Sequence, residues 1–233
     1  MTEEKIRINK FLANRYNIAR RNADKKIEAG KVFINGRKAI LGDKVSPEDR
    51  VELKEKVKDK FSYYAYNKPR GLITNKQEKG EKDIISSVSL KGIYPVGRLD
   101  KDSEGLILLT DNGRITDKLL NPIYDHDKEY IVKTRTPIKE SQLRVMERGM
   151  DLEGDIRTKP CKTRYIDERT FSITLSEGKK HQIRRMCDAF TLPIGSLKRV
   201  RVMNIRLGDL KPGQYRKIEG EELKTLLKSL GVN

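Results

Sequence analysis

Two carboxylates, Asp100 and Asp102, lie in a polar, glycine-containing stretch that runs directly into the apolar segment LILLT at residues 106–110. A carboxylate at the edge of such a strand, in a protein rich in cations, is a candidate nucleophile or general base, because nearby positive charge keeps it ionised. Two other interpretations stay open. Aspartates in loops commonly form turns, and a D-x-D pair could hold the Mg²⁺ that a hydrolytic nuclease needs.

A second candidate segment is EGKKHQIRRM, residues 177–186. Its continuation has helical spacing, and the expected buried stripe consists of Ile183, Met186, Cys187 and Phe190. Arg184 and Arg185 therefore flank the core, and one of them can reach a site at the beginning of the helix. His181 is one of only two histidines. It is equally well explained as a polar residue at a helix start, so a histidine-based acid–base pair is not favoured.

The charge of the chain indicates the kind of partner. The 51 Lys and Arg residues exceed the 34 Asp and Glu residues, which gives a net charge of +17 and favours a polyanion such as nucleic acid. No apolar run approaches the roughly 20 residues of a membrane-spanning helix, and the N-terminus lacks the apolar stretch of a signal peptide. We therefore expect a cytoplasmic protein without membrane contact.

Motifs for metals and common cofactors are absent from the sequence. Cys161 and Cys187 are too few for a disulfide framework or a four-ligand zinc site, and reduced thiols are expected. Neither GxxxxGK nor GxGxxG occurs, so use of ATP or NAD is not supported. We expect no metal site and no cofactor.

The first 60 residues predict a small basic domain. Apolar spacing indicates two short helices, and KVFINGRKAI at residues 31–40 is typical of a hairpin with an Asn-Gly turn. The run KEKVKDK at 54–60 suits a linker, so we place the domains at 1–60 and 61–233. The order of helix, helix and hairpin resembles the S4 RNA-binding domain. Its expected RNA contacts are Arg7, Lys10, Arg20, Arg21, Lys25 and Lys31.

Beyond residue 60, strand patterns are separated by helical ones. Strands are expected in FSYYAYNK, GLILLT, KEYIVKT, TFSITL and KRVRVMNIRL, and helices at 113–120, 139–149, 181–190 and 220–230. The order is not a regular βαβ alternation. It predicts an α+β fold with a mixed, largely antiparallel sheet, flanking helices and a central cleft.

Three ordered segments carry a family resemblance. GRLDKDSEGLILLT, KEYIV and EGKKHQIRRM are similar to the three motifs of the pseudouridine synthases, and with the S4-like N-terminus they resemble the RsuA branch over residues 6–217. The resemblance implies a cofactor-free isomerisation: the glycosidic bond of a uridine breaks and re-forms at carbon 5 of the base. Ser103 stands where threonine is often found, and FTLPIGSLKR lacks the usual glycine after the RRM helix, which leaves substrate details open.

The resemblance also assigns roles to residues. It places the catalytic aspartate at Asp100, a stacking tyrosine at Tyr130, and at Arg184 a guanidinium that pairs with Asp100. Whether the carboxylate attacks ribose carbon 1 or removes the carbon 2 proton stays open. Tyr130 could also be an ordinary core aromatic. Further RNA contacts are expected at Arg98, Lys179, Lys180, Arg185, Lys198, Arg199 and Arg201.

The expected partner is ribosomal RNA, and the expected state is a monomer. Within the branch, DHDKEYIV, LDKDSEGLI and LKRVRVMNIRL look most like the RluF-type enzymes of large-subunit rRNA. Small-subunit rRNA and a tRNA stem-loop are the alternatives. A non-catalytic rRNA-binding protein and a metal-dependent nuclease using Asp100 and Asp102 are the competing functions.

Overall fold

The computed structural model describes residues 5–16, 18, 20–54, 60–75, 82–154 and 156–232. The chain forms two compact units. Unit 1 consists of Met1–Phe61 with Asp111–Asp117, and unit 2 of Ser62–Thr110 with Lys118–Asn233. Most of the expected linker at 54–60 lies outside the described residues, since 55–59 are not among them.

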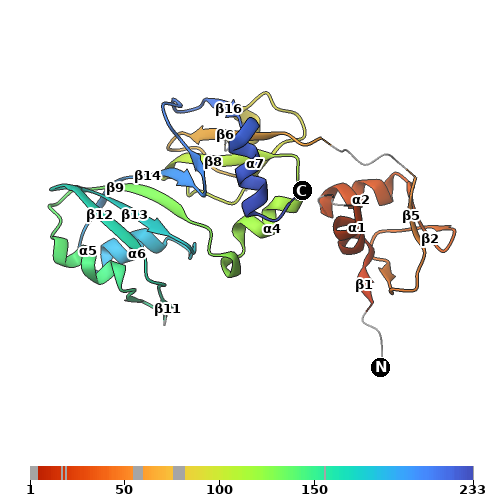
Figure 1. Cartoon of the computed structure of the whole chain (residues 1–233), viewed down its shortest axis with the longest axis horizontal. Coiled ribbons are helices and arrows are strands. Elements are labelled where there is room, and N and C mark those ends of the chain that lie inside the picture. Colours follow the sequence, from red (N-terminus) through yellow and green to blue (C-terminus); the bar gives the residue numbers. More distant parts are fainter. Residues whose placement is uncertain are drawn as a thin grey trace. The chain divides into compact units, whose positions relative to one another are not determined.

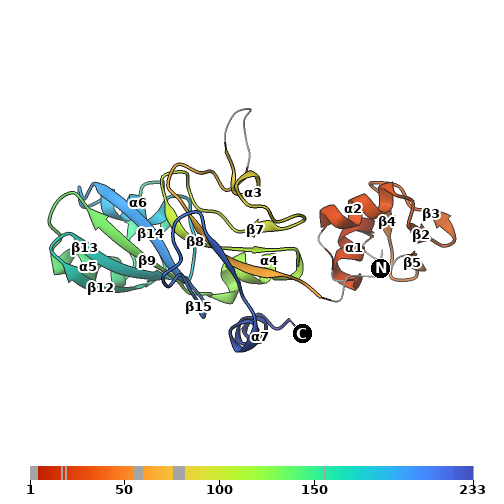
Figure 2. The same cartoon turned by 90° about the horizontal axis from the view of Figure 1, so that it is seen from above.

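Unit 1 contains two helices and two small sheets. Helices α1 (Ile8–Tyr16) and α2 (Arg20–Glu28) lie side by side (Figure 2) and bury Ile8, Leu12, Ala23 and Ile27. The strands are β1 (Ile6–Arg7), β2 (Val32–Ile34), β3 (Arg37–Lys38), β4 (Lys44–Val45) and β5 (Val51–Leu53), in the orders β1-β4 and β3-β2-β5. The hairpin of β2 and β3 turns at Asn35 and Gly36, both with positive φ (49° and 85°). A tight hairpin of this kind requires that geometry, and Asn-Gly adopts it readily.

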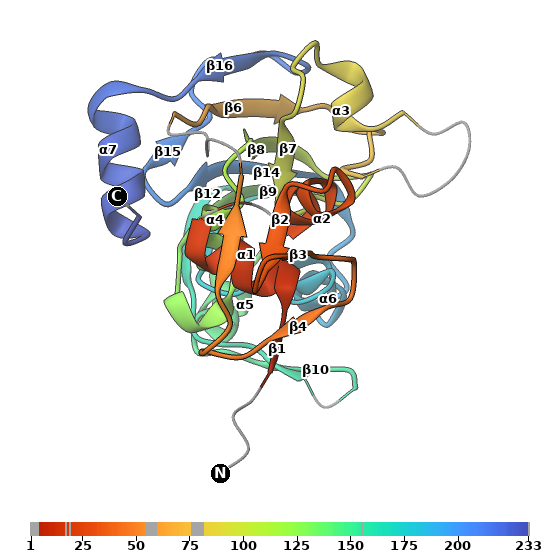
Figure 3. The same ribbon diagram turned by 90° about the vertical axis from the view of Figure 1, so that its right-hand side faces the viewer.

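Unit 2 is built on one nine-stranded sheet (Figures 1 and 3), whose main path runs β12-β13-β9-β14-β8-β6-β16, with β15 on β14 and β7 on β8. Its strands are β6 (Tyr63–Lys68), β7 (Tyr94–Val96), β8 (Glu104–Thr110), β9 (Lys128–Thr134), β12 (Lys162–Asp167), β13 (Thr170–Leu175), β14 (Ile194–Val202), β15 (Ile205–Arg206) and β16 (Tyr215–Lys217). A separate hairpin pairs β10 (Asp151–Leu152) with β11 (Ile156–Arg157). Only β8 and β14 pair in parallel among the described strands of this sheet, so the predicted mixed, largely antiparallel α+β fold is confirmed.

The helices of unit 2 are short. They are α3 (Ile84–Ser87), the 3₁₀ turn η1 (Pro122–Tyr124), α5 (Glu140–Glu147), α6 (Gln182–Asp188) and α7 (Gly220–Ser229). Helix α4 (Arg114–Leu120) begins in the segment assigned to unit 1 and ends in unit 2. Helices α5 and α6 pack on the half of the sheet that holds β9 and β13 (Figure 1). No helix among the described residues is long and apolar enough to cross a membrane.

Two apolar clusters of described residues lie in the core of unit 2. One contains Phe171, Ile173 and Met186 beneath α5 and α6, and the other contains Tyr66, Ile84 and Ile107 around α3. Tyr130 is half-buried and packs against both clusters. In β13 the apolar side chains Phe171, Ile173 and Leu175 alternate with polar ones, and Ser172 is also only 5% exposed. The strand pairs at both edges, with Arg164 of β12 and Ile131 of β9 beside Ser172.

Candidate active site

Asp100 lies in the loop that connects β7 to β8, and its side chain is 41% exposed. The loop backbone is held at several points. The Ser103 amide donates to the Asp100 carbonyl at 3.0 Å, and the Gly71 amide donates to the Lys101 carbonyl at 2.8 Å. These bonds fix the path of the chain on the C-terminal side of the carboxylate.

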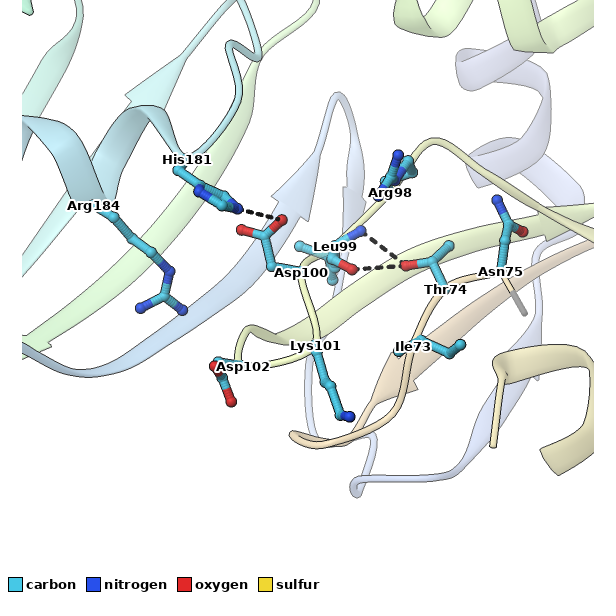
Figure 4. A pocket seen from close by; sticks show the side chains of 10 residues that line it. All are labelled: Ile73, Thr74, Asn75, Arg98, Leu99, Asp100, Lys101, Asp102, His181 and Arg184. Carbon is cyan, nitrogen blue, oxygen red and sulfur yellow. Dashed lines mark hydrogen bonds and ion pairs between the residues drawn. The ribbon is translucent and has the colours of Figure 1, made fainter. Parts of the chain in front are cut away.

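Thr74 holds the other side of the same loop (Figure 4). Its buried hydroxyl donates to the Leu99 carbonyl at 2.7 Å and accepts from the Leu99 amide at 3.1 Å. One side chain thus satisfies both backbone groups of the residue that precedes Asp100. The carboxylate is open to solvent, but its backbone is anchored on either side.

Lys68, at the end of β6, holds this loop by hydrogen bonds from its ammonium group. Its ammonium is fully buried and donates to the carbonyls of Leu72 at 2.6 Å, Pro69 at 3.0 Å and Lys101 at 3.4 Å. Burial lowers the pKa of Lys68 to about 8, although the negative charges of Asp100, Asp102 and Glu104 act in the opposite direction. Lys68 was not predicted as a site residue, and its only signal in the sequence is a charged residue that ends a strand before Pro-Arg-Gly.

We expect Lys68→Met to slow turnover more than it weakens RNA binding, because the loop carbonyls lose their buried donor while the RNA surface is unchanged. Steady-state kinetics on an unmodified RNA fragment that carries the target uridine measure both, with exposed Lys91→Met as the control. Between about pH 8 and 10.5 the unfolded chain binds the Lys68 proton and the folded chain releases it, so the free energy of unfolding of the wild type rises with pH in that window. Lys68→Met lacks this group. In urea unfolding, the free energy of unfolding of the wild type minus that of Lys68→Met should therefore increase from pH 7.5 to 9.5, and a decrease would contradict the assigned role.

Helix α6 brings two further groups to Asp100. His181 directly precedes the helix with a left-handed backbone (φ 53°, ψ 27°), an uncommon conformation for a residue with a side chain. It places Nε2 3.6 Å from Asp100 Oδ1. The structure thus gives Asp100 a histidine neighbour that the sequence pattern did not favour.

Arg184 lies one helical turn further along α6 and lines a pocket together with Asp100 and His181. Its Nη2 donates to the buried hydroxyl of Ser103 at 3.2 Å. Among the described residues no ion pair joins it to Asp100, so the expected pairing is corrected: in this structure Ser103 holds the guanidinium instead. Arg184 is still placed beside the carboxylate, because Ser103 is three residues from Asp100.

Asp100 lies between two adjoining hollows of about 490 and 400 Å³. Both are lined by Arg98, Leu99, Asp100, His181 and Arg184. Tyr130 lines the second hollow, together with the aliphatic side chains of Leu175 and Leu197. The predicted catalytic residues therefore meet at one place. A flat, partly apolar wall beside an open carboxylate and several cations can hold an unstacked base with its sugar and phosphate.

Glu177 also lines the second hollow, and its side chain is buried. Its carboxylate accepts from the Lys159 amide (2.8 Å), Gln182 (2.7 Å) and the Lys179 ammonium (2.6 Å). Burial would raise the pKa of Glu177, but these donors, led by Lys179, hold it below its usual value. The ionised Glu177 fixes the segment that leads into α6.

These contacts change the predicted RNA-binding set. Lys179 is tied to Glu177 and to the Arg157 carbonyl, and Arg185 donates to the Glu153 carbonyl. Arg199 is 6% exposed and donates to Leu106, so the prediction that it contacts phosphate is wrong: the parallel pairing of β8 and β14 buries it. Arg201 is paired with Glu129 at 2.8 Å.

The other predicted contacts have accessible side chains. Arg98 and Lys180 are exposed and line the second hollow, and Lys198 is half-buried on β14. In unit 1 all the predicted residues are exposed: Arg7, Lys10, Arg20, Arg21, Lys25 and Lys31. Asp102 is 70% exposed and lies 3.9 Å from Arg70. Within the described part of the chain, no group of three or more His, Cys, Asp or Glu side chains is arranged to hold a metal ion.

Comparison with known families identifies the class of protein. Residues 62–189 match the RNA pseudouridylate synthase family, and residues 6–51 match the S4 domain. The chain belongs to the RNA pseudouridine synthase family and carries an S4 domain at its N-terminus.

Particular relatives are similar along nearly the whole chain. "Dual-specificity RNA pseudouridine synthase RluF" of Escherichia coli strain K12 is 38% identical over 98% of this chain and 80% of its own length. "Ribosomal large subunit pseudouridine synthase B" of Bacillus subtilis is 34% identical over 94% of this chain and 95% of its own. A crystal structure titled as a pseudouridylate synthase is 28% identical and superposes with a TM-score of 0.71, covering 97% of this chain and 99% of its own.

Proposed function

We propose that this protein converts a uridine of large-subunit ribosomal RNA to pseudouridine, with Asp100 as the catalytic carboxylate. The observation that carries the proposal is the position of Asp100: a half-exposed carboxylate on an anchored loop, in a hollow also lined by Arg98, His181 and Arg184. Large-subunit RNA is supported by the similarity to the large-subunit pseudouridine synthase of Bacillus subtilis, 95% of whose length is covered. The similarity to RluF, which is named a dual-specificity enzyme, supports a second RNA substrate as the next candidate.

The site residues have distinct proposed roles. Asp100 acts at the ribose of the flipped nucleotide, either on carbon 1 as a nucleophile or on carbon 2 as a base. Both routes need a negatively charged carboxylate oxygen. Tyr130 stacks on the uracil, since its ring packs in the wall of the hollow. Arg98, exposed beside the opening, stabilises the flipped state.

The two parts of the chain divide recognition and chemistry. We assign residues 1–60 to RNA binding through the exposed cations of the S4 domain, and residues 61–233 to the isomerisation. The enzyme works as a cytoplasmic monomer. It needs no metal or cofactor, because the isomerisation conserves all atoms and requires no oxidant or energy source.

Incubation with unmodified large-subunit rRNA, small-subunit rRNA and tRNA, followed by carbodiimide-dependent reverse-transcription stops, tests the proposal. We expect new stops in the large-subunit RNA. Stops confined to small-subunit rRNA or tRNA would refute the substrate and leave the reaction intact. No new stop in any of the RNAs, with protein that binds them, would favour the non-catalytic alternative.

A further inference from the structure

An exposed aromatic pair lies in the connection between α4 and β9, outside the site described above. Tyr124 is 47% exposed, and its ring stacks on His126 with centroids 6.0 Å apart and planes 17° from parallel. Ile123 beside it is 76% exposed. Large exposed apolar side chains grouped in this way commonly belong to a binding surface.

The loop that presents Tyr124 is built from specific contacts. The Asn121 side chain accepts from the Ile123 amide at 3.2 Å, and Asp125 has a left-handed backbone (φ 49°, ψ 42°) that ends the 3₁₀ turn. Lys128 donates to the His126 carbonyl at 2.8 Å. These contacts hold the backbone on both sides of Tyr124, which lowers the entropic cost of ordering the loop on binding.

Contacts connect this loop to both flanks of the second hollow. Leu120 packs against Gly97, the neighbour of Arg98, so closely that a Cβ on Gly97 would lie 2.7 Å from Leu120 Cδ2. On the other flank, Lys159 pairs with Asp125 at 2.6 Å, and its amide donates to Glu177, which lines the hollow. The aromatic pair is thus continuous with the rim of the site that holds Asp100.

The carboxylates around the pair are engaged by cations. Asp125 is paired with Lys159, and Arg201 is shared between Glu129 at 2.8 Å and Asp127 at 3.8 Å. Burial, with help from Lys128, lowers the pKa of His126, which keeps its imidazole neutral and suited to stacking under Tyr124. An exposed, neutral π-surface is suited to stacking on an unpaired base of a nucleic acid.

We infer that the Tyr124–His126 pair is a second base-binding site, which stacks an unpaired nucleobase close to the target uridine in the same RNA. The inference rests on the proposed function, since it takes the ligand to be the substrate RNA. It gives the enzyme a second contact with an unpaired segment of the RNA, in addition to the flipped uridine. The contact is made with the face of the base, so it tolerates different bases.

The probe is a large-subunit rRNA fragment that carries the mapped uridine. Tyr124→Ala in the full-length protein should weaken binding of this fragment roughly 5- to 100-fold, the range for loss of one base–aromatic stack. The dependence of Kd on salt should not change, because no phosphate contact is lost. Tyr124→Phe should bind like wild type, and so should Tyr165→Ala, which removes a similarly exposed tyrosine (41%) on β12.

Fragments with an abasic nucleotide at each position near the target identify the stacked base. At one position the abasic change should weaken wild-type binding and have no added effect with Tyr124→Ala. Tyr124→Ala that binds like Tyr165→Ala, or abasic effects that add to it at every position, would overturn the second site. These outcomes concern affinity only. A wild-type protein that binds the fragment without forming pseudouridine would instead refute the proposed function.

Discussion

Asp100→Asn should reduce pseudouridine formation by at least roughly 10²- to 10⁴-fold, the range for loss of a catalytic base, and by more if the carboxylate is the nucleophile. The carboxamide keeps the size of the side chain but cannot carry the negative charge. The loop should keep its conformation, because Thr74, Gly71 and Lys68 hold its backbone rather than its carboxylate. RNA affinity and melting temperature are therefore expected to stay near wild type.

Asp102→Asn is the matched control for this variant. Asp102 lies two residues away, is 70% exposed and only weakly paired with Arg70. It should keep nearly full activity. Residual turnover above a few per cent in Asp100→Asn, or an equal loss in both variants, would show that Asp100 is not the essential group.

Gly105→Ala should destabilise the protein by about 3 kcal/mol or more, through crowding and an unfavourable backbone conformation together. Gly105 has φ 104° and faces Arg199 across the parallel pairing of β8 and β14. A Cβ there would lie 2.2 Å from the Arg199 carbonyl oxygen and 2.8 Å from its amide nitrogen. These are backbone atoms, so the clash is relieved only if the two strands separate.

Thermal unfolding measures this effect, and a loss of about 3 kcal/mol corresponds to roughly 6–12 °C in a chain of this size. Gly92→Ala is the control, since Gly92 also has a positive φ (74°) but open space around its Cβ position. It should show only the backbone cost, about 1 kcal/mol. Equal melting temperatures for the two variants would contradict the close approach of β8 and β14.

Local sequence patterns predicted much of the fold and the centre of the site. The strand expected at 128–134 has those bounds, and the helix expected at 181–190 is α6 at Gln182–Asp188. The family motifs placed Asp100, Tyr130 and Arg184 together, and all three line the second hollow. Such segments are predictable because their apolar spacing and their chemistry lie within a few residues of one another.

Features that depend on distant pairing could not be predicted in this way. Strand β12 is mostly exposed at the edge of the sheet, so its sequence shows no apolar alternation. Arg199 looked like a surface cation, but the parallel partner β8 covers it and offers the Leu106 carbonyl. Lys179 likewise donates to the carbonyl of Arg157, 22 residues earlier in the chain. In both cases the partner lies on another element, which local spacing does not encode.

The position of His181 also could not be predicted from local sequence, because it depends on an uncommon backbone conformation. Its left-handed conformation turns the imidazole toward Asp100, and nothing in the local sequence demands that conformation from a histidine. Strained residues of this kind concentrate at functional sites because the surrounding structure supports them. Its closeness to the carboxylate is thus a result of the tertiary fold.

The most direct test of the central claim is release of tritium from RNA labelled at carbon 5 of its uracils. Pseudouridine formation joins the ribose to that carbon and releases its hydrogen to water, so each pseudouridine should release one tritium. We expect this one-to-one ratio from wild-type protein, with intact RNA chains and the same rate in the presence of a chelator. Cleaved RNA, inhibition by the chelator, or pseudouridine-free RNA without tritium release would contradict the account.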